Sequence, residues 1–307
     1  MNGIVVKSTG SWYAVRMDTG EMLECRIKGK LRLEGIKTTN PVAVGDRVDV
    51  EVKPEETPVI RMILERKNYI IRRSTNLSRE AHIIAANVDQ AIMVVTLSHP
   101  RTSTVFVDRF LVSAEAYRVP AIIVFNKIDL YGEEDLFLME ALMDVYRKIG
   151  YRCLPVSAKT GEGMPELEVL LKDKISVLTG LSGVGKSTLI NRIEPGLQLK
   201  TAEISESHDT GKHTTTFAEM LPLGGGGYIV DTPGIRAFGL TRMDRGEISH
   251  YFPEIFRISP RCRYYNCTHI HEPGCAVLEA IASGEISEIR YGSYLSMFEE
   301  SDDKYRK

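Results

Sequence analysis

Long hydrophobic runs are missing from this sequence of 307 residues. No apolar segment approaches the roughly 20 residues that a membrane-spanning helix requires, so we expect no association with a membrane. The first six residues are typical of a β-strand, not of a basic region followed by a long apolar segment, so we also expect no signal peptide. Both absences favour a cytoplasmic protein. Internal repeats and low-complexity segments are missing too, which excludes a repeat architecture.

Cysteine is scarce, with five residues in the whole chain. The number is odd, and Cys25 and Cys153 stand alone in apolar, strand-like stretches, so a framework of disulfide bonds is disfavoured. The other three cysteines lie close together between Cys262 and Cys275. This distribution favours a reducing compartment and a single metal cluster.

The clustered cysteines and a nearby histidine have the spacing of a zinc site. Cys262-x₄-Cys267-x-His269-x₅-Cys275 supplies three thiolates and an imidazole, a closed tetrahedral set that suits one structural Zn²⁺. His271 is a competing ligand for the histidine position. Because such a site has no open coordination position, we expect no metal catalysis there.

Excess charge is nearly absent overall, with a formal net charge of −2, but the charge is unevenly distributed. Residues 1–79 contain fifteen Lys and Arg against ten Asp and Glu, a balance of +5, and the remainder carries −7. A basic N-terminal arm on an acidic body predicts a polyanionic partner for the arm. The alternative is a solvated basic surface without a partner. The residues that carry the prediction most directly are Lys28, Lys30, Arg32, Arg72 and Arg73.

The composition, 43% hydrophobic and 26% charged, is that of a globular protein, and the length allows two or three domains. Residues 1–67 contain short strand-like segments separated by turns, which predicts a small closed barrel with an oligonucleotide-binding (OB) fold. Residues 68–80 are predicted to be a linker. Residues 81–239 alternate apolar strands with helices, as in a mainly parallel α/β sheet. Residues 240–307 are predicted to be a mostly helical zinc-binding domain, so the fold class is multidomain.

A phosphate loop follows an apolar strand and precedes a helix. Its glycines let the backbone curl so that N–H groups face phosphate oxygens. Lys186 places a positive charge on the β- and γ-phosphates, and the Ser187 hydroxyl ligates Mg²⁺. The predicted nucleotide-binding residues of this loop are Gly180, Ser182, Gly183, Val184, Gly185, Lys186, Ser187 and Thr188.

The tetrapeptide Asn126-Lys127-Ile128-Asp129 predicts that the nucleotide base is guanine. It ends an apolar strand, where open α/β sheets bind ligands. The Asp129 carboxylate can accept hydrogen bonds from both N1–H and the exocyclic amine of guanine, whereas adenine has no donor at N1. Asn126 can tie the loops together, and the stem of Lys127 can lie over the base. A backbone N–H of the segment Ser157-Ala158-Lys159 can reach the guanine carbonyl oxygen.

The segment Asp231-Thr-Pro-Gly234 ends another strand and completes the predicted nucleotide site. Asp231 can hold Mg²⁺ through water, and the Gly234 N–H can sense the γ-phosphate. The next residue is Ile235, where many GTPases have a glutamine that orients the attacking water. Because isoleucine cannot form a hydrogen bond with water, the water must be positioned by another group.

Candidates for that group lie in the polar loop 208–216. His213 is the candidate catalytic residue that orients the water. One of the three threonines at positions 214–216 can complete the Mg²⁺ shell, and we favour Thr215. The alternative is that His213 is an exposed loop residue without a catalytic role.

The motifs occur in a rotated order, because the guanine-binding segments precede the phosphate loop instead of following it. Such a circular permutation keeps the sheet when the original chain ends lie close together at the surface. As a consequence, the strand ending at Asp231 leads directly into the C-terminal domain. Release of the γ-phosphate contact is therefore expected to be transmitted to that domain.

These motifs together resemble the circularly permuted GTPases of the family called small-ribosomal-subunit-dependent GTPase A. The segments that carry the resemblance are Ala85–Gln90, Asn126–Asp129, Thr179–Ser187, Gly211–Thr216, Asp231–Arg236 and Glu272–Cys275. The resemblance spans nearly the whole chain. It implies an N-terminal OB barrel that binds rRNA, a C-terminal zinc domain, GTP hydrolysis stimulated by the small (30S) ribosomal subunit, and a role in late maturation of that subunit. It also implies that His213 is catalytic.

Two classes of function follow from these observations. The first is a GTP-driven factor for ribosome assembly, with GTP or GDP, Mg²⁺ and one structural Zn²⁺ as cofactors, the small subunit and its rRNA as partners, and a monomeric state. The second is an RNA-binding regulatory protein that uses GTP as a ligand with negligible turnover, which Ile235 keeps open. An ATPase or kinase would require another explanation for Asn126 and Asp129.

Overall fold

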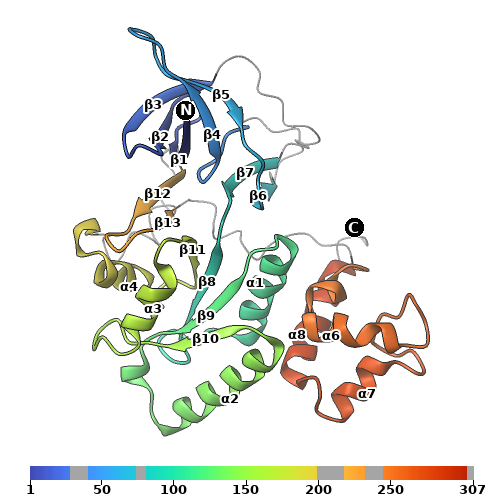
Figure 1. Ribbon diagram of the computed structural model, residues 1–307. Coiled ribbons are helices and arrows are strands. Elements are labelled where there is room, and N and C mark those ends of the chain that lie inside the picture. Colours follow the sequence, from blue (N-terminus) through green and yellow to red (C-terminus); the bar gives the residue numbers. More distant parts are fainter. Residues whose placement is uncertain (28–40, 74–80, 199–217, 232–244, 303–307) are drawn as a thin grey trace. The chain divides into compact units, whose positions relative to one another are not determined.

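The computed structural model describes residues 1–27, 41–73, 81–198, 218–231 and 245–302 (Figure 1). The chain forms two compact units: residues 1–92, 163–179 and 186–237 make the first, and residues 93–162, 180–185 and 238–307 make the second. Strand β8 (Gln90–Val95) runs from the first unit into the second. The domain boundaries expected from the sequence, at residues 67, 80 and 239, remain predictions.

The first unit begins with a closed five-stranded barrel, as the sequence predicted. Its strands are β1 (Asn2–Ser8), β2 (Tyr13–Met17), β3 (Met22–Ile27), β4 (Arg47–Glu51) and β5 (Val59–Ile63). β1 pairs with β2, β2 with β3, β3 with β5, β5 with β4, and β4 with β1, so the ring of hydrogen bonds closes. Alternate residues point inward and fill the interior with Val5, Tyr13, Val15, Met17, Cys25, Val42, Val48, Val50 and Ile60.

A two-stranded antiparallel ribbon follows the barrel and occupies part of the expected linker. It consists of β6 (Tyr69–Arg73) and β7 (Ala81–Ala86). Ile70 is 1% exposed, so a buried apolar side chain anchors this strand. The basic composition of the segment had led us to expect a linker instead. Arg66 and Asp46 form a buried ion pair with Nε to Oδ1 at 2.6 Å, which holds the start of the ribbon to the barrel.

The remaining elements of the first unit come before and after residues 180–185 along the chain. They are α3 (Met164–Leu171), β11 (Ile175–Thr179), α4 (Lys186–Ile193), the 3₁₀ helix η2 (Pro195–Leu197), β12 (Ala218–Pro222) and β13 (Tyr228–Asp231). β11 and β13 pair in parallel, with Val177 opposite Val230. β12 and β13 form an antiparallel hairpin around the four glycines at positions 224–227, and β12 also pairs with β1.

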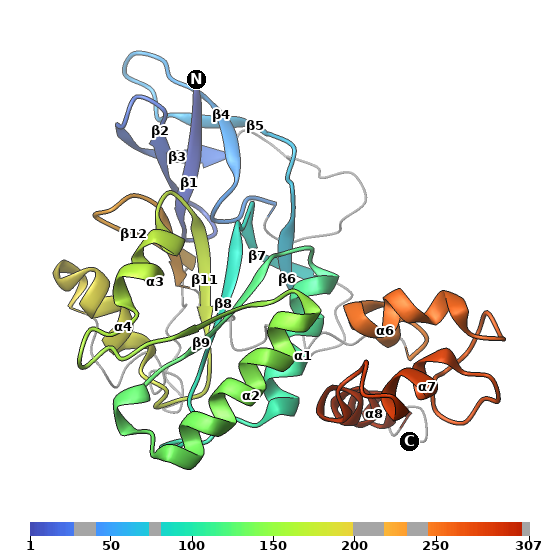
Figure 2. The same cartoon turned by 60° about the horizontal axis from the view of Figure 1, so that its bottom comes forward.

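The second unit contains β9 (Ala121–Phe125) and β10 (Arg152–Pro155), which pair in parallel, with β8 beside β9. Helices α1 (Thr104–Ala116) and α2 (Glu133–Ile149) lie side by side (Figure 2). The first turn of α2 is acidic and its last turn is basic, which complements the helix dipole. The helix ends at Gly150, whose φ of 118° is the left-handed conformation that glycine adopts at low cost.

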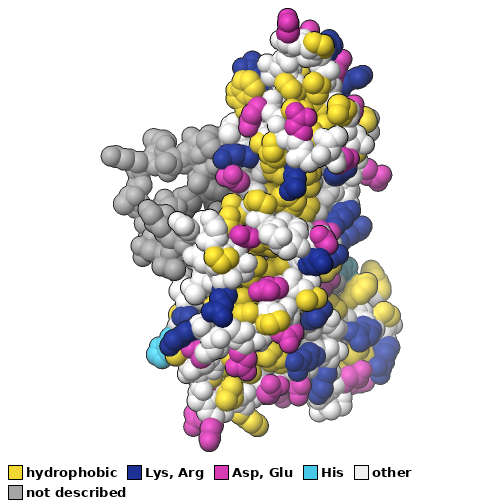
Figure 3. Space-filling view, turned by 60° about the vertical axis from the view of Figure 1, so that its left-hand side comes forward, with side chains coloured by type: hydrophobic (Ala, Val, Ile, Leu, Met, Phe, Trp, Pro, Cys, Tyr) yellow, Lys and Arg dark blue, Asp and Glu magenta, His cyan; other side chains and the backbone are white. Residues whose placement is uncertain are grey.

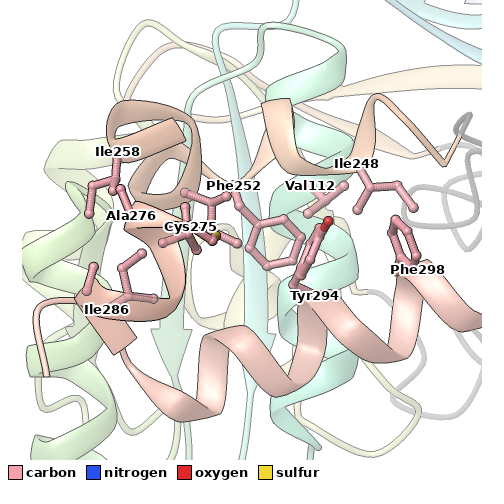
Figure 4. Packing of buried hydrophobic residues seen from close by; sticks show 12 residues of the cluster. Val112, Ile248, Phe252, Ile258, Cys275, Ala276, Ile286, Tyr294 and Phe298 are labelled. Carbon is pink, nitrogen blue, oxygen red and sulfur yellow. The ribbon is translucent and has the colours of Figure 1, made fainter. Parts of the chain in front are cut away.

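Short helices of the C-terminal region share one apolar core with α1. They are η4 (Ile248–Tyr251), α6 (Pro253–Ile258), η5 (Ser259–Arg261), α7 (Ala276–Ala282) and α8 (Glu288–Asp302). Figure 4 shows Phe252 and Tyr294 at the centre, with Val112 of α1 beside them. The rings of Phe252 and Tyr294 meet edge to face with centroids 5.6 Å apart. The expected mostly helical C-terminal region is therefore confirmed.

A buried ion cluster also joins α8 to α1 and α6. Arg290 is 0% exposed; its Nη1 lies 2.6 Å from Oδ1 of Asp108, and its Nε lies 2.7 Å from Oε1 of Glu254. The Tyr146 hydroxyl donates a further hydrogen bond to Asp108. Because removal of one partner would leave a charge buried and unpaired, the cluster specifies how α8 packs on α1. None of the helices in the described part of the chain has the length and apolar character needed to cross a bilayer.

Candidate nucleotide site and metal cluster

The side chain of Asn126 holds two backbone loops together at the end of β9. Its Nδ2 donates a hydrogen bond to the carbonyl oxygen of Val184 at 2.8 Å, and its Oδ1 accepts one from the N–H of Ala158 at 3.2 Å. Asn126 is 1% exposed, so these bonds are shielded from water. Three segments that are separate in the sequence, around residues 126, 158 and 184, are thereby brought to one place.

Asp129 is exposed, and a hydrogen bond from a buried serine orients its carboxylate. The Ser157 hydroxyl donates a hydrogen bond to Oδ1 of Asp129 at 2.6 Å and accepts one from the N–H of Thr160 at 3.0 Å. Ser157 is fully buried. The position of the carboxylate is therefore set before any ligand arrives, and Lys159, which is exposed, follows on the same loop.

Two glycines of the phosphate loop lie where a side chain could not fit, and a third has a backbone conformation that favours glycine. A Cβ atom at Gly180 would collide with the carbonyl oxygen of Val94, and one at Gly185 would collide with Nδ2 of Asn126. The φ angles of Gly180, Gly183 and Gly185 are 148°, 84° and 93°, which favour glycine. Between them, Ser182 is exposed and Val184 is buried. The loop therefore has a backbone that depends on glycine, as expected of a phosphate-binding loop.

Three further residues that are expected to bind phosphate or magnesium, Lys186, Ser187 and Asp231, belong to the first unit. Lys186 and Ser187 begin α4 directly after the loop, with Ser187 buried and Thr188 exposed. Asp231 is the last residue of β13, the strand that pairs in parallel with β11 just before the phosphate loop. His213, Thr215 and Gly234 lie outside the described residues, as does Ile235, and their expected roles remain predictions.

The four predicted zinc ligands form one cluster in the C-terminal region. The ligand atoms of Cys262, Cys267, His269 and Cys275 all lie within 4.8 Å of one another. Nδ1 of His269 lies 3.6 Å from the sulfur atoms of both Cys262 and Cys275, and those two sulfur atoms are 3.9 Å apart. Tetrahedral coordination at Zn–S of about 2.3 Å and Zn–N of about 2.0 Å requires separations near these values.

His271 is exposed and is not part of this cluster, so the open choice between the two histidines falls on His269. Burial raises the pKa of Cys267 to about 12, and burial lowers the pKa of His269. Without a cation, this site therefore favours a protonated thiol and a neutral imidazole. A divalent metal would offset the cost of burying the thiolates, so the donor set fits Zn²⁺.

Glu272 organises the loop that carries His269. Its carboxylate accepts hydrogen bonds from the N–H and the hydroxyl of Thr268 at 2.7 and 2.5 Å, and from the N–H groups of Ile270 and His271. Partial burial opposes the charge of Glu272, but these hydrogen bonds prevail and lower its pKa well below the usual value. The carboxylate thus fixes the backbone of the loop that carries His269.

Asn126 holds three backbone segments together, and one of them is a glycine loop with the sequence of a phosphate loop. With the rotated order of the motifs, these features define a circularly permuted P-loop GTPase. Family models agree with this class. A model described as "RsgA GTPase" matches residues 63–241, and one described as "RsgA N-terminal domain" matches residues 2–60. The chain belongs to the RsgA GTPase family, and it is a GTPase.

Relatives match over the whole length. "Small ribosomal subunit biogenesis GTPase RsgA" of Bacteroides fragilis (strain YCH46) is 57% identical over 307 residues, covering 100% of this chain and 99% of the relative. The protein of the same name from Porphyromonas gingivalis (strain ATCC 33277) is 54% identical over 312 residues, again covering 100% and 99%.

Two solved structures share the fold. The crystal structure of YjeQ from Thermotoga maritima superimposes with a TM-score of 0.81 at 41% identity and 98% coverage of both chains. YloQ, described as a circularly permuted GTPase, gives a TM-score of 0.78 at 31% identity, covering 99% of this chain and 95% of that one.

Sequence motifs did not indicate every residue that shapes these sites. Tyr131, Pro100 and Glu272 all support predicted residues, yet none was singled out for such a role. Tyr131 and Glu272 lie close to predicted residues along the chain. Pro100 follows β8 in a loop that carries no nucleotide motif, so only the fold reveals it.

Proposed function

We propose that this GTPase acts in the biogenesis of the small ribosomal subunit and that the subunit stimulates its hydrolysis of GTP. Full-length similarity to relatives that carry the name "Small ribosomal subunit biogenesis GTPase RsgA" supports the role. The single structural observation that carries the nucleotide assignment is the Asn126 side chain, bonded to both Val184 and Ala158. A ribosomal partner implies that the protein works in the cytoplasm, and we propose that it acts as a monomer.

The proposed guanine site uses Asp129 to accept from the base, the stem of Lys127 to cover it, and a backbone N–H near Ala158 to meet its carbonyl oxygen. The phosphates lie on the loop 180–185, with the Lys186 ammonium group on the β- and γ-phosphates. Selectivity for guanine follows because adenine would leave the carboxylate without its two donors.

Magnesium fits the residues that close this site. Ser187 would supply its hydroxyl, with Asp231 through water and Thr215 as the remaining protein groups. A Mg²⁺ ion held by these residues would supply positive charge that offsets the negative charge developing during hydrolysis. Each of these residues is an oxygen donor, as Mg²⁺ prefers.

The experiment that tests the proposed function is a comparison of GTP hydrolysis with and without purified small ribosomal subunits. We expect slow intrinsic turnover and a much faster rate in the presence of subunits. Co-sedimentation with the subunits in GDP, GTP and a non-hydrolysable analogue should show tighter binding of the triphosphate state. A rate unaffected by subunits would contradict the proposal.

Zinc is the metal we propose for the cluster, and elemental analysis is expected to find one zinc per chain. Cys267→Ser removes a ligand. Substitution of a residue that only supports a ligand lowers metal affinity by about 10–100-fold, so loss of the ligand itself should lower it further. GTP binding should be kept. His271→Ala is the matched control, because this exposed histidine lies outside the cluster. Full zinc content in a variant that lacks both Cys262 and Cys275 would rule the cluster out.

The barrel is proposed to bind rRNA. On the face shown in Figure 3, basic and acidic side chains are intermixed. Lys28, Lys30 and Arg32 lie outside the described residues. Deletion of residues 1–67 would be a poor test, because it removes β1 and so leaves an edge of β12 unpaired.

A triple alanine variant of Lys28, Lys30 and Arg32 tests the barrel more cleanly. If these residues contact rRNA phosphates, affinity for small subunits should fall, and the slope of log affinity against log salt should decrease by about one per lost contact. GTP binding should not change. The control removes three basic barrel residues that are within 4 Å of glutamates, at 3.1, 3.9 and 3.9 Å: Lys7, Lys53 and Arg61. Equal salt slopes in both variants would move the rRNA contact elsewhere.

A further inference from the structure

The hydroxyl group of Tyr131 joins two backbone segments that no sequence motif connects. It donates a hydrogen bond to the carbonyl oxygen of Asn126 at 2.9 Å and accepts one from the N–H of Leu97, also at 2.9 Å. Tyr131 is 8% exposed, and burial raises the pKa of Tyr131 to about 12. The hydroxyl therefore keeps its proton at neutral pH and can fill both roles.

The segment that begins at Leu97 folds back on itself before α1 starts. The N–H of Thr102 donates to the carbonyl oxygen of Thr96 at 2.8 Å, and the hydroxyl of Thr96 donates to the carbonyl oxygen of Pro100 at 2.5 Å. Residues 97–102 thus form a compact turn whose shape is set internally. Its orientation depends on what holds it from outside.

Two residues of the segment 126–131, which we call the guanine loop, bind this turn from outside. Tyr131 binds Leu97, and Nζ of Lys127 donates to the carbonyl oxygen of His99 at 2.6 Å. Both Lys127 and His99 have left-handed backbone conformations, with φ of 64° and 51°. Such conformations are uncommon outside glycine and persist where surrounding contacts determine them.

The turn also lies beside the phosphate loop. Pro100 is a neighbour of Gly183, where an added Cβ atom would be in van der Waals contact with Cδ of the proline, at 3.4 Å. Asn126 reaches the next residue of the same loop through its bond to Val184. Tyr131 thus binds the guanine loop to the turn, the turn lies beside the phosphate loop, and Asn126 binds the phosphate loop to the guanine loop. All these residues belong to the second compact unit.

We infer that Tyr131 is a positioning residue for guanine nucleotide binding, which keeps the guanine loop and the 97–102 turn in register with the phosphate loop. The inference rests on the proposed assignment of Asn126 and Lys127 to the nucleotide site. Without the hydroxyl, the Leu97 N–H and the Asn126 carbonyl would turn toward water in the free protein. The nucleotide would then have to reorder both, which weakens binding and speeds release.

Tyr131→Phe tests the inference because it removes only the hydroxyl. Dissociation of fluorescently labelled GDP should become roughly 5- to 30-fold faster, the effect of losing one or two kcal/mol. KM for GTP should rise by a similar factor while kcat at saturating GTP stays close to that of the wild type. The matched control is Tyr151→Phe, which removes another buried hydroxyl, bonded to Glu115 at 3.0 Å, in the same compact unit.

Both variants are expected to lower the melting temperature, but only Tyr131→Phe should speed nucleotide release. Equal GDP dissociation in Tyr131→Phe and wild type would overturn the inference, as would equal acceleration in Tyr151→Phe. Hydrogen exchange on the wild type gives a test that needs no variant: GDP should slow exchange of the Leu97 amide, and no slowing would also overturn it. If Asp129→Asn leaves GTP binding intact, the proposed site itself fails, so the two failures are distinguishable.

Discussion

Asp129→Asn is expected to weaken GTP binding by roughly 10²- to 10⁴-fold, since it disrupts two charge-assisted hydrogen bonds to guanine, each of about 1.5–3 kcal/mol. The same variant should bind xanthosine triphosphate better than GTP. Xanthine has a carbonyl oxygen where guanine has its amine, and an asparagine can donate to that oxygen while accepting from N1–H. Titration with labelled nucleotides measures both effects.

The structure sharpens this expectation, because the carboxylate is oriented by Ser157 before the nucleotide arrives. Ser157→Ala should therefore weaken GTP binding as well, by about tenfold, without changing the preferred base. Asp144→Asn is the matched control: it makes the same substitution at an exposed position of α2 and should bind GTP like the wild type. Unchanged GTP affinity in Asp129→Asn would remove that residue from the site.

Local sequence patterns were sufficient to predict much of the fold. The barrel was predicted from short strand-like segments, and the α/β sheet from apolar strands that alternate with helices. Each of these patterns is set by neighbours within a few residues along the chain. The strand β6 was missed because Tyr69, Ile70 and Ile71 stand in a basic segment whose composition is typical of a connector. Its partner, β7, begins at Ala81, eight positions after β6 ends at Arg73, and no local pattern reveals that pairing.

Contacts between distant residues set the limit of prediction for the sites. Asn126 and Val184 are 58 positions apart, and Arg290 and Asp108 are 182 apart, so only the folded chain shows that they are bonded. Cysteine spacing predicted the metal ligands, but the choice of His269 over His271 depended on which ring turns inward. Tyr131 carries no motif at all, since its role depends on a backbone N–H donated by Leu97.

The rotated order of motifs makes a mechanical hypothesis sharper. The strand ending at Asp231 is followed in sequence by the C-terminal region, which led us to expect that γ-phosphate release moves that region. The helices there share a core with Val112 of α1, and Arg290 ties α8 to Asp108 through a buried ion pair. If these helices moved independently of α1, the shared apolar core and the buried ion pair would be exposed to water. We therefore expect that a movement caused by γ-phosphate release involves α1 and these helices together.

His213→Ala is expected to keep GTP affinity and small-subunit binding but to lose on the order of 10²–10⁴ in the stimulated rate, the usual cost of removing a positioned acid–base group. The reason is the isoleucine at position 235, which cannot hydrogen-bond to water where many GTPases use glutamine. Another group must orient the attacking water, and His213 stands in a sequence segment with glycine and threonines, two positions before Thr215, the expected Mg²⁺ ligand. We expect that docking on the subunit holds His213 in productive geometries and so raises the rate.

Single-turnover hydrolysis with and without small subunits measures this effect, because it separates the chemical step from product release. His271→Ala is the control for loss of a histidine elsewhere, since this residue is exposed and outside the metal cluster. Thr215→Ala should behave differently from His213→Ala: loss of a Mg²⁺ ligand impairs the triphosphate-bound state as well as the rate. If His213→Ala is stimulated as strongly as the wild type, the water is positioned by another group, and the ribosomal subunit itself becomes the leading candidate.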